Sequence, residues 1–217
     1  MLIVKNKSRA LDTIGPVARP VTPLRGAHAR EAILKAAGER FMADGLRRTS
    51  IEAIAAAAGV SRPTVYAHFA SKDEIFRTIV TDLHDEQLAA MEAAIDPAEE
   101  VADRLYAALV ARFVPFVTLT AASPHGAELL DENSRVCGDI NRSAHKRSLR
   151  TLERLLSDAD AAGDLDLADA ALSPAIAATL FYDAALGAKE DASVTPAAYR
   201  RQLRRLVTVL TRGLGAR

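Results

Sequence analysis

The chain has 217 residues, of which 49% are hydrophobic and 26% charged, and its formal net charge is zero. This composition is typical of a globular protein, and the single cysteine, Cys137, excludes an intramolecular disulfide framework and a Cys-rich zinc site. No apolar run reaches the roughly 18 to 20 residues that a membrane span needs, and no secretory pattern opens the sequence, so we expect a cytoplasmic protein with no membrane partner.

Residues 1–25 differ in composition from the rest of the chain. They contain three prolines and five basic residues, which are Lys5, Lys7, Arg9, Arg19 and Arg25. Because prolines at this density break regular structure and favour extended backbone before them, we expect a mostly irregular basic arm. The segment is either a solvated tail or an arm that contacts DNA, and the sequence leaves both open.

The apolar periodicity after residue 25 is helical, with no alternating strand pattern. A first helix is expected at 27–44 and a second at 51–57. Thr49 or Ser50 supplies the N-cap of the second helix. Glu52 lies three residues after Thr49, which is the spacing of a capping box.

Two further helix starts follow a short break at Gly59. Ser61 is the expected N-cap of a third helix that reaches about Phe69, and Pro63 lies in its first turn, where a missing backbone N–H is harmless. Ser71 is expected to cap a fourth, long helix. Two short helices joined by a tight, glycine-containing turn are the sequence form of a helix-turn-helix, which indicates DNA binding.

The residues around the third helix are of the kinds that contact DNA. Arg62 can bind guanine or a phosphate, and the polar tips of Tyr66 and His68 suit phosphate oxygens. Arg48 flanks the turn before the second helix. The expected DNA-binding residues are Arg47, Thr49, Ser50, Ser61, Arg62, Pro63, Thr64, Tyr66, His68 and Lys72.

The charge of the chain changes sign where this region ends. Residues 1–72 contain 12 basic and 5 acidic side chains, a net charge of +7, whereas residues 73–217 contain 16 basic and 23 acidic side chains, a net charge of −7. Such asymmetry indicates that the N-terminal part is a nucleic-acid-binding segment.

The rest of the chain is also predicted to be helical, so the expected fold class is all-α. Helices are expected at 98–119, 124–136, 139–162, 173–189 and 196–214. The last of them carries an apolar stripe, and its basic residues belong most simply to a solvated face. These basic residues are Arg200, Arg201, Arg204 and Arg205.

Residues 30–76 resemble the N-terminal DNA-binding domain of the TetR (tetracycline-repressor-like) family. The shared features are Ile33-Leu34, Phe41, Gly45, Thr49-Ser50, Ile54-Ala55, Ala58-Gly59-Val60-Ser61, Thr64, Tyr66, His68-Phe69 and Ser71-Lys72. The resemblance covers 47 of the 217 residues and is specific, because many spaced positions agree at once. Pro63 departs from the small residue, often glycine, that the family has there, which bears on operator preference.

The resemblance implies an all-α homodimer. Its segments would be the arm at 1–25, a helix-turn-helix DNA-binding domain at 26–72 and a helical effector-binding and dimerisation domain at 73–217. Such a dimer binds a palindromic operator through two recognition helices about 34 to 36 Å apart, or a multiple of that spacing. The resemblance further implies that the protein is a repressor, that a small-molecule effector releases it from DNA, and that it requires no cofactor.

The resemblance also implies that the last two helices form the dimer interface. The small residues Ala177, Ala184, Gly187 and Ala188 would allow close helix approach there. The alternative is that both helices simply pack within one domain.

The resemblance implies an effector pocket in the C-terminal domain. Apolar and aromatic residues of this domain are candidates for its lining, although residues at this spacing are more often plain core. The apolar candidates are Phe113, Phe116, Leu129, Leu149 and Phe181, with Leu152 and Tyr182 in the same pattern. The polar candidates are His84, His125, Asp131 and His145. Of these, His84, Asp131 and His145 are also candidates for a metal site, but their spacing matches no recognised metal motif.

Two other classes of function stay open beside a regulator. An enzyme would need a nucleophile with its base, or a metal with an open position, and the chain has no G-x-S-x-G, HExxH, CxxC or Gly-rich phosphate loop. We therefore expect no enzymatic activity. An architectural DNA-binding protein would use the basic arm without a ligand. Cys137 is either a redox sensor or, as is commoner for a lone cysteine, a buried and inert side chain.

Overall fold

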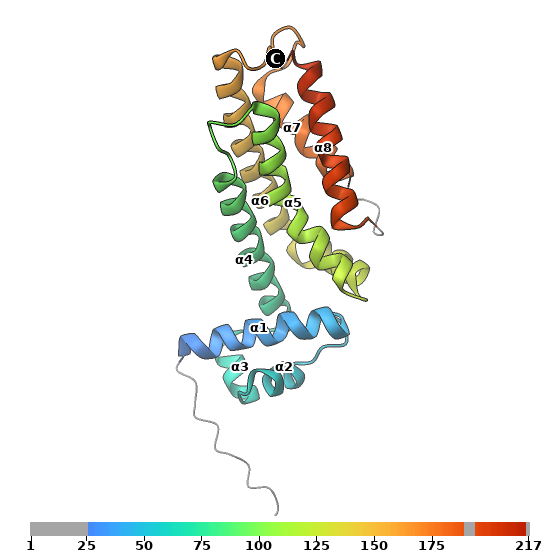
Figure 1. Ribbon diagram of the computed structural model, residues 1–217. Coiled ribbons are helices and arrows are strands. Elements are labelled where there is room, and N and C mark those ends of the chain that lie inside the picture. Colours follow the sequence, from blue (N-terminus) through green and yellow to red (C-terminus); the bar gives the residue numbers. More distant parts are fainter. Residues whose placement is uncertain (1–25, 189–193, 216–217) are drawn as a thin grey trace, which may run out of the picture.

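The computed structural model describes residues 26–188 and 194–215, and all regular structure within these ranges is α-helical (Figure 1). The predicted all-α fold class is confirmed. The arm expected at 1–25 lies outside the described residues. The described helices are α1 (Gly26–Asp44), α2 (Ile51–Ala58), α3 (Arg62–His68), α4 (Lys72–Ala93), α5 (Val101–Ala122), α6 (Gly126–Ala162), α7 (Pro174–Gly187) and α8 (Pro196–Gly213).

The helix starts in the N-terminal domain are fixed by serine caps. The Ser61 hydroxyl accepts a hydrogen bond from the backbone N–H of Thr64 at 3.3 Å, and that of Ser50 accepts from Ala53 at 3.1 Å. Ser71 caps α4 in the same way. Each cap satisfies a backbone donor that the first helical turn leaves free, so the starts of α2, α3 and α4 follow directly from local sequence.

Thr49 does not cap α2, and the expected capping box between Thr49 and Glu52 is absent. Thr49 is only 3% exposed, and its hydroxyl donates to the backbone carbonyl of Gly45 at 2.7 Å. The hydroxyl is therefore turned back into the α1–α2 loop and away from the α2 N–H groups. The neighbouring Ser50 is exposed and takes the capping role.

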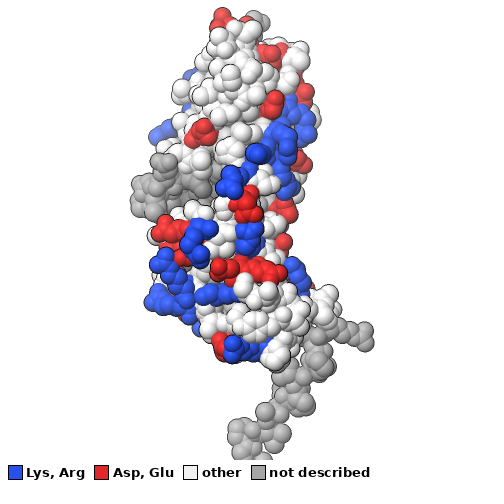
Figure 2. Space-filling view, turned by 180° about the vertical axis from the view of Figure 1, so that it is seen from behind, with Lys and Arg blue, Asp and Glu red and all other residues white. Residues whose placement is uncertain are grey.

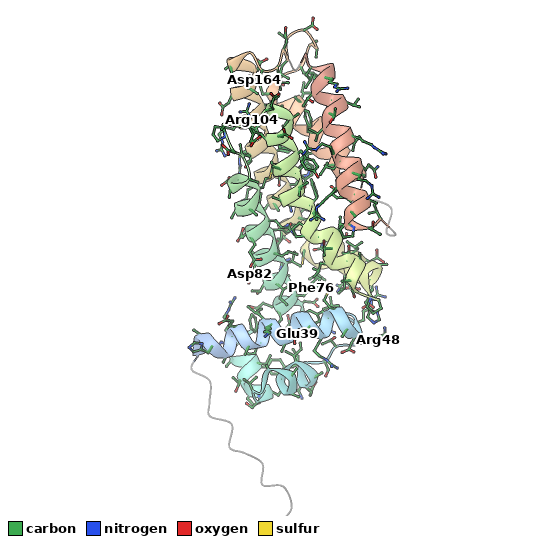
Figure 3. The ribbon with its side chains drawn as sticks, viewed as in Figure 1. Glu39, Arg48, Phe76, Asp82, Arg104 and Asp164 are labelled. Carbon is green, nitrogen blue, oxygen red and sulfur yellow. The ribbon has the colours of Figure 1, made fainter. Side chains whose placement is uncertain are left out.

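A small hydrophobic core holds α1, α2 and α3 against the first turns of α4. Ile33 and Phe41 of α1, Ile54 of α2 and Val65 of α3 are buried in it. Phe76 of α4 packs edge-on against Phe41, with ring centroids 5.7 Å apart, and lies between α1 and the base of α4 in Figure 3. Helix α4 thus enters the N-terminal core before it continues into the larger domain, as Figure 1 shows.

In the larger domain, α5 packs against α4, α6, α7 and α8 (Figure 1). Its buried side chains include Leu105, Leu109 and Phe113, in one core with Leu152 of α6 and Phe181 of α7. By length and composition, α5 is apolar enough to cross a membrane, a run that sequence reasoning did not single out. Eight of its residues are buried in the protein, which is the environment of a core helix.

Helix α6 consists of two helical segments that meet at a kink, as expected from sequence, which predicted helices at 124–136 and 139–162. The kink lies at Cys137, whose backbone angles are non-helical, with φ −119° and ψ 18°. The Cys137 side chain is fully buried, and burial raises the pKa of its thiol to about 11. A buried, protonated thiol is a poor nucleophile, so the structure gives the redox-sensor hypothesis no support.

Candidate DNA-binding interface and effector pocket

The outer face of α3 carries the side chains that its sequence assigned to DNA recognition. Arg62, Pro63 and Tyr66 are exposed, and Thr64 and His68 are half-buried. The Arg62 Nη2 atom donates to the Tyr66 hydroxyl at 3.4 Å, and the guanidinium lies 5.4 Å from the centroid of the Tyr66 ring. This contact holds a cation and an aromatic ring together on an uncovered helical face.

Arg62 is also paired with an acidic residue of the preceding helix. Its Nη1 atom lies 2.8 Å from Glu52 Oε1, and both side chains are 57% exposed. A hydrogen bond from the backbone of Glu52 itself, together with the Arg62 charge, lowers the pKa of the Glu52 carboxyl. Glu52 is therefore ionised at neutral pH, and a DNA phosphate would compete with it for Arg62.

Several of the expected DNA-binding residues have structural partners. Lys72 Nζ donates to the backbone carbonyls of Leu46 at 2.6 Å and of Thr49 at 2.8 Å. Thr49 is itself buried, and Ser50 and Ser61 cap their helices. In this conformation, these side chains hold the α1–α2 loop and the start of α3 in shape.

The α1–α2 loop contacts the first turns of α6, and we call this contact the junction. Its residues are Gly45, Arg47 and Arg48 from the loop and His125, Glu128 and Glu132 at and after the start of α6. The backbone N–H of Arg47 donates to Glu128 Oε1 at 3.0 Å, and Arg47 Nε donates to Glu132 Oε1 at 2.7 Å. Arg48 Nη2 lies 3.1 Å from Nδ1 of His125, and Figure 3 shows Arg48 at this end of α1. His125, which was expected in the effector pocket, thus lies in the junction.

Glu132 is the buried centre of the junction. Its side chain is 3% exposed and lies within 2.7 Å of both Arg47 and Arg135. Hydrogen bonds from Arg135 and Arg47 lower the pKa of the Glu132 carboxyl, so it remains ionised at neutral pH. Gly45, beside Glu128, has a φ of 83°, a backbone conformation that favours glycine.

A pocket of about 500 Å³ lies between α4, α5, α6 and α7, a volume typical of small-molecule sites. The structure brings four of the expected effector residues together in its lining, which are His84, Phe113, Phe116 and His145. Tyr182 completes its aromatic wall, because the Tyr182 ring packs against both Phe113 and His145.

The other expected effector residues lie outside this pocket. Leu129 lines a neighbouring hollow of about 170 Å³ that shares His84 and Phe116 with the pocket. Phe181 is in the hydrophobic core, Leu149 packs against it, and Asp131 is exposed on α6. Core and pocket residues recur at the same helical spacing, so the sequence alone could not separate them.

Most of the polar lining of the pocket was not expected from sequence. These residues are Arg112, Asn133, Ser134, Asn141, Arg142 and Lys146. One signal was present, because Arg112 continues the buried stripe of Leu105, Ala108 and Leu109 on a mostly apolar helix. An arginine on such a stripe predicts a buried polar site.

The three residues suggested as metal ligands do not form one group, because His84 and His145 line the pocket and Asp131 does not. Among the described residues, no three His, Cys, Asp or Glu side chains are grouped so that they could hold a metal ion. His84 Nε2 lies 2.9 Å from Asn141 Oδ1, and His145 packs edge-on against the Tyr182 ring at 4.5 Å between centroids.

The fold and the site define a helix-turn-helix protein whose helical C-terminal domain contains a pocket. Residues 33–79 match the family model of the bacterial regulatory proteins of the TetR family. The Escherichia coli repressor ComR is 28% identical over 142 residues, which cover 63% of this chain and 67% of ComR. KstR2 of Mycolicibacterium smegmatis and BepR of Brucella suis, both repressors, are 29% and 41% identical, but over only 46% and 28% of their lengths.

Solved structures share the fold over nearly the whole described chain. A TetR-family regulator from Mesorhizobium loti superposes with a TM-score of 0.68 at 20% identity, covering 87% of this chain and 97% of its own. SmeT, the repressor of the Stenotrophomonas maltophilia efflux pump SmeDEF, has a TM-score of 0.64 at 24% identity, covering 85% and 89%. SmeT has also been solved in complex with triclosan. Residues 33–79 thus match the DNA-binding domain of the TetR family, and the described helices share the fold of solved TetR-family regulators.

Proposed function

We propose that this protein is a ligand-responsive transcriptional repressor that binds a palindromic operator as a homodimer and is released by a small-molecule effector. One observation carries the proposal, which is that the first half of α6 takes part in both sites. Glu128 and Glu132 of this segment hold the α1–α2 loop, whereas Leu130, Asn133 and Ser134 line the pocket.

This arrangement supports a mechanism for release. An effector that fits the pocket only when the first half of α6 shifts would move Glu128 and Glu132, and the α1–α2 loop with them. The orientation of α3 would then change, and in a dimer the spacing of the two recognition helices would no longer match the DNA. Coupling of this kind is typically about 1 to 3 kcal/mol and acts equally in both directions.

Exposed apolar side chains support a dimer through the last two helices. Ile176 and Leu180, one turn apart on α7, are 52% and 46% exposed, and Val209 on α8 is 68% exposed. A second copy of α7 and α8 would cover these side chains in a four-helix interface. The dimer would present its two α3 helices to major grooves about 34 to 36 Å apart.

The proposed activity takes place on chromosomal DNA, so we place the protein in the cytoplasm with no membrane partner. It needs no cofactor besides the effector.

Selection of bound duplexes from random DNA, using the full-length protein, tests the proposal. We expect enrichment of one near-palindrome, and weaker binding of it by about tenfold when Arg62 or Tyr66 is replaced by alanine. Arg150→Ala, which removes an exposed cation of α6, is the matched control and should bind normally. If no sequence is enriched over random DNA, the protein is not an operator-specific regulator, and an architectural role would explain its DNA binding better.

A further inference from the structure

The pocket has a one-sided charge. Its basic and titratable lining residues are Arg112, Arg142 and Lys146 together with His84 and His145, and there is no Asp or Glu among the described residues that line it. Asp85 and Asp139, on the pocket-forming helices α4 and α6, are already paired with Arg147 at 2.5 Å and with Arg77 at 2.7 Å. The described lining of the pocket therefore contains basic side chains and no carboxylate to balance their charge.

Arg112 is the deepest of these cations. It is 4% exposed, its Nε donates to Ser148 Oγ at 2.8 Å, and its Nη1 donates to Gln87 Oε1 at 2.5 Å. Its Nη2 lies 3.3 Å from His84 Nδ1. None of these partners carries a negative charge. Burial lowers the pKa of Arg112 and the Tyr182 hydroxyl opposes this effect, but a guanidinium stays charged in proteins.

A buried charge without a counter-charge is costly, and an anion that reaches it removes that cost. A guanidinium is well suited to this task, because its planar fork matches the two oxygens of a carboxylate. The aromatic side chains of Phe113 and Tyr182 shield the same end of the pocket from water, which strengthens the attraction.

The neighbouring hollow has the opposite character. It shares His84, Phe116 and Asn133 with the basic pocket, and it continues between α4 and α5 to Phe41 and Met42 of α1. Apart from the shared residues its lining is almost wholly apolar. The two spaces together offer a cationic end and an apolar end.

We propose that the effector is an amphipathic organic acid, with its carboxylate bound at Arg112 and His84 and its apolar chain in the hollow beneath α1. This inference rests on the proposed function, since it takes the pocket as the effector site. The apolar chain would touch Phe41 and Met42 of α1. Because α1 is a helix of the DNA-binding domain, the ligand would contact that domain directly.

A purely structural role for Arg112 is the competing explanation. The hydrogen bonds from Arg112 to Gln87 and Ser148 connect α5 to α4 and α6. These interhelical hydrogen bonds could stabilise the fold without any ligand. The two explanations differ in what they predict for charged and neutral ligands of equal shape.

Calorimetric titration of the full-length protein without DNA separates them. Octanoate, 1-octanol and octylamine have similar chains but different head groups, and butyrate keeps the carboxylate with a shorter chain. We expect octanoate to bind roughly 10- to 100-fold more tightly than 1-octanol, because the alcohol cannot form the charged hydrogen bonds of the carboxylate, and octylamine to bind least. Affinity should rise about fourfold for each added methylene that the hollow buries.

Arg112→Gln should remove the preference for octanoate over 1-octanol. Because Arg112 is buried and could be needed for folding, Lys146→Gln and Arg142→Gln, at exposed positions of the rim, serve as second variants, with severalfold weaker octanoate binding expected. Arg150→Gln, one turn beyond Lys146 and outside the lining, is the matched control. Equal binding of octanoate and 1-octanol, no acid binding up to about 1 mM, or full octanoate affinity in the rim variants would overturn the inference.

Measuring operator affinity with and without octanoate, beside the calorimetric titration, distinguishes this inference from the proposed function. Octanoate that binds as described but leaves operator affinity unchanged supports the ligand class and contradicts the role of the pocket in release. Loss of operator specificity in the selection experiment, with octanoate binding intact, would contradict the repressor proposal alone.

Discussion

Arg62 is held in place before any DNA is present. Glu52 pairs with Nη1 of its guanidinium and the Tyr66 hydroxyl accepts from Nη2, and all three side chains are exposed. Such contacts restrict the side chain to few rotamers, so less conformational entropy is lost when DNA binds. The ion pair between Arg62 and Glu52 must also break before Arg62 can bind a phosphate or a base. The Glu52 carboxylate then remains as a negative charge close to the DNA.

Replacing Glu52 by glutamine should therefore strengthen DNA binding. We expect about two- to fivefold higher affinity for operator and random DNA alike, because one exposed ion pair and one repulsive charge are removed. Fluorescence anisotropy at two salt concentrations measures this. Glu39→Gln, an exposed carboxylate on α1 (Figure 3), is the control. Weaker binding by Glu52→Gln would show that Glu52 positions Arg62 for recognition.

The elements that sequence reasoning predicted well are those whose ends depend on local chemistry. The caps at Ser61 and Ser71 were predicted, and Ser50 was one of the two residues proposed for α2, because a cap involves residues only three positions apart. The interruption expected between the helices at 124–136 and 139–162 is also present, as the kink at Cys137.

The pocket and the junction show where prediction from sequence failed. Aromatic spacing identified Phe113 and Phe116 but could not distinguish them from the core residue Phe181. The junction joins Arg47 to Glu132, residues 85 positions apart, and no periodicity links them. The basic character of Arg47 suggested DNA, whereas its partner depends on how α6 lies against the α1–α2 loop.

Helix α6 provides a prediction of its own. Arg47→Ala and Glu132→Gln should each weaken operator binding about fivefold, because the ion pair fixes how the N-terminal domain sits on α6. The double variant should be no weaker than the worse single one, since both changes remove the same interaction. Operator titrations of the three variants measure this.

An ion pair within the larger domain is the control for these variants. Arg104 and Asp164 are paired at 2.7 Å. Figure 3 shows both residues at the end of the larger domain that is far from α1. Arg104→Ala and Asp164→Asn should leave operator affinity unchanged. Equal effects from both pairs would mean that the junction acts only through overall stability.

At the scale of the whole molecule, the net charge of +7 on residues 1–72 is divided unequally between the arm and the helix-turn-helix domain. Residues 1–25 account for a net charge of +4 and residues 26–72 for only +3. In the described domain, Arg40, Arg47 and Arg62 are each paired with a carboxylate. Figure 2 shows Lys and Arg interleaved with Asp and Glu where the two domains meet. Residues 1–25 therefore supply more than half of the net positive charge of residues 1–72.

Deleting residues 1–25 tests whether the arm contacts DNA. If its five basic side chains bind phosphates, the slope of log K against log salt should become shallower by about 0.9 for each phosphate that is no longer neutralised, and affinity should fall at low salt. Titrations over a salt series measure both quantities. An unchanged slope would identify the segment as a solvated tail.

The dimer predicts a specific effect of charge on α7. Leu180→Asp should give a folded monomer with much weaker operator binding, because a carboxylate would be buried in the four-helix interface. Light scattering after gel filtration measures the mass, and circular dichroism checks the fold. Leu119→Asp, at a position 41% exposed on α5, should stay dimeric. A dimeric Leu180→Asp protein would place the interface elsewhere.

The proposed function depends most on α3 reading a particular DNA sequence. The most direct measurement compares the dissociation constants of the full-length protein for its selected palindrome and for a scrambled duplex of the same length and composition at physiological salt. We predict that the palindrome binds at least about 10³-fold more tightly. Equal dissociation constants for the two duplexes would contradict the proposed function.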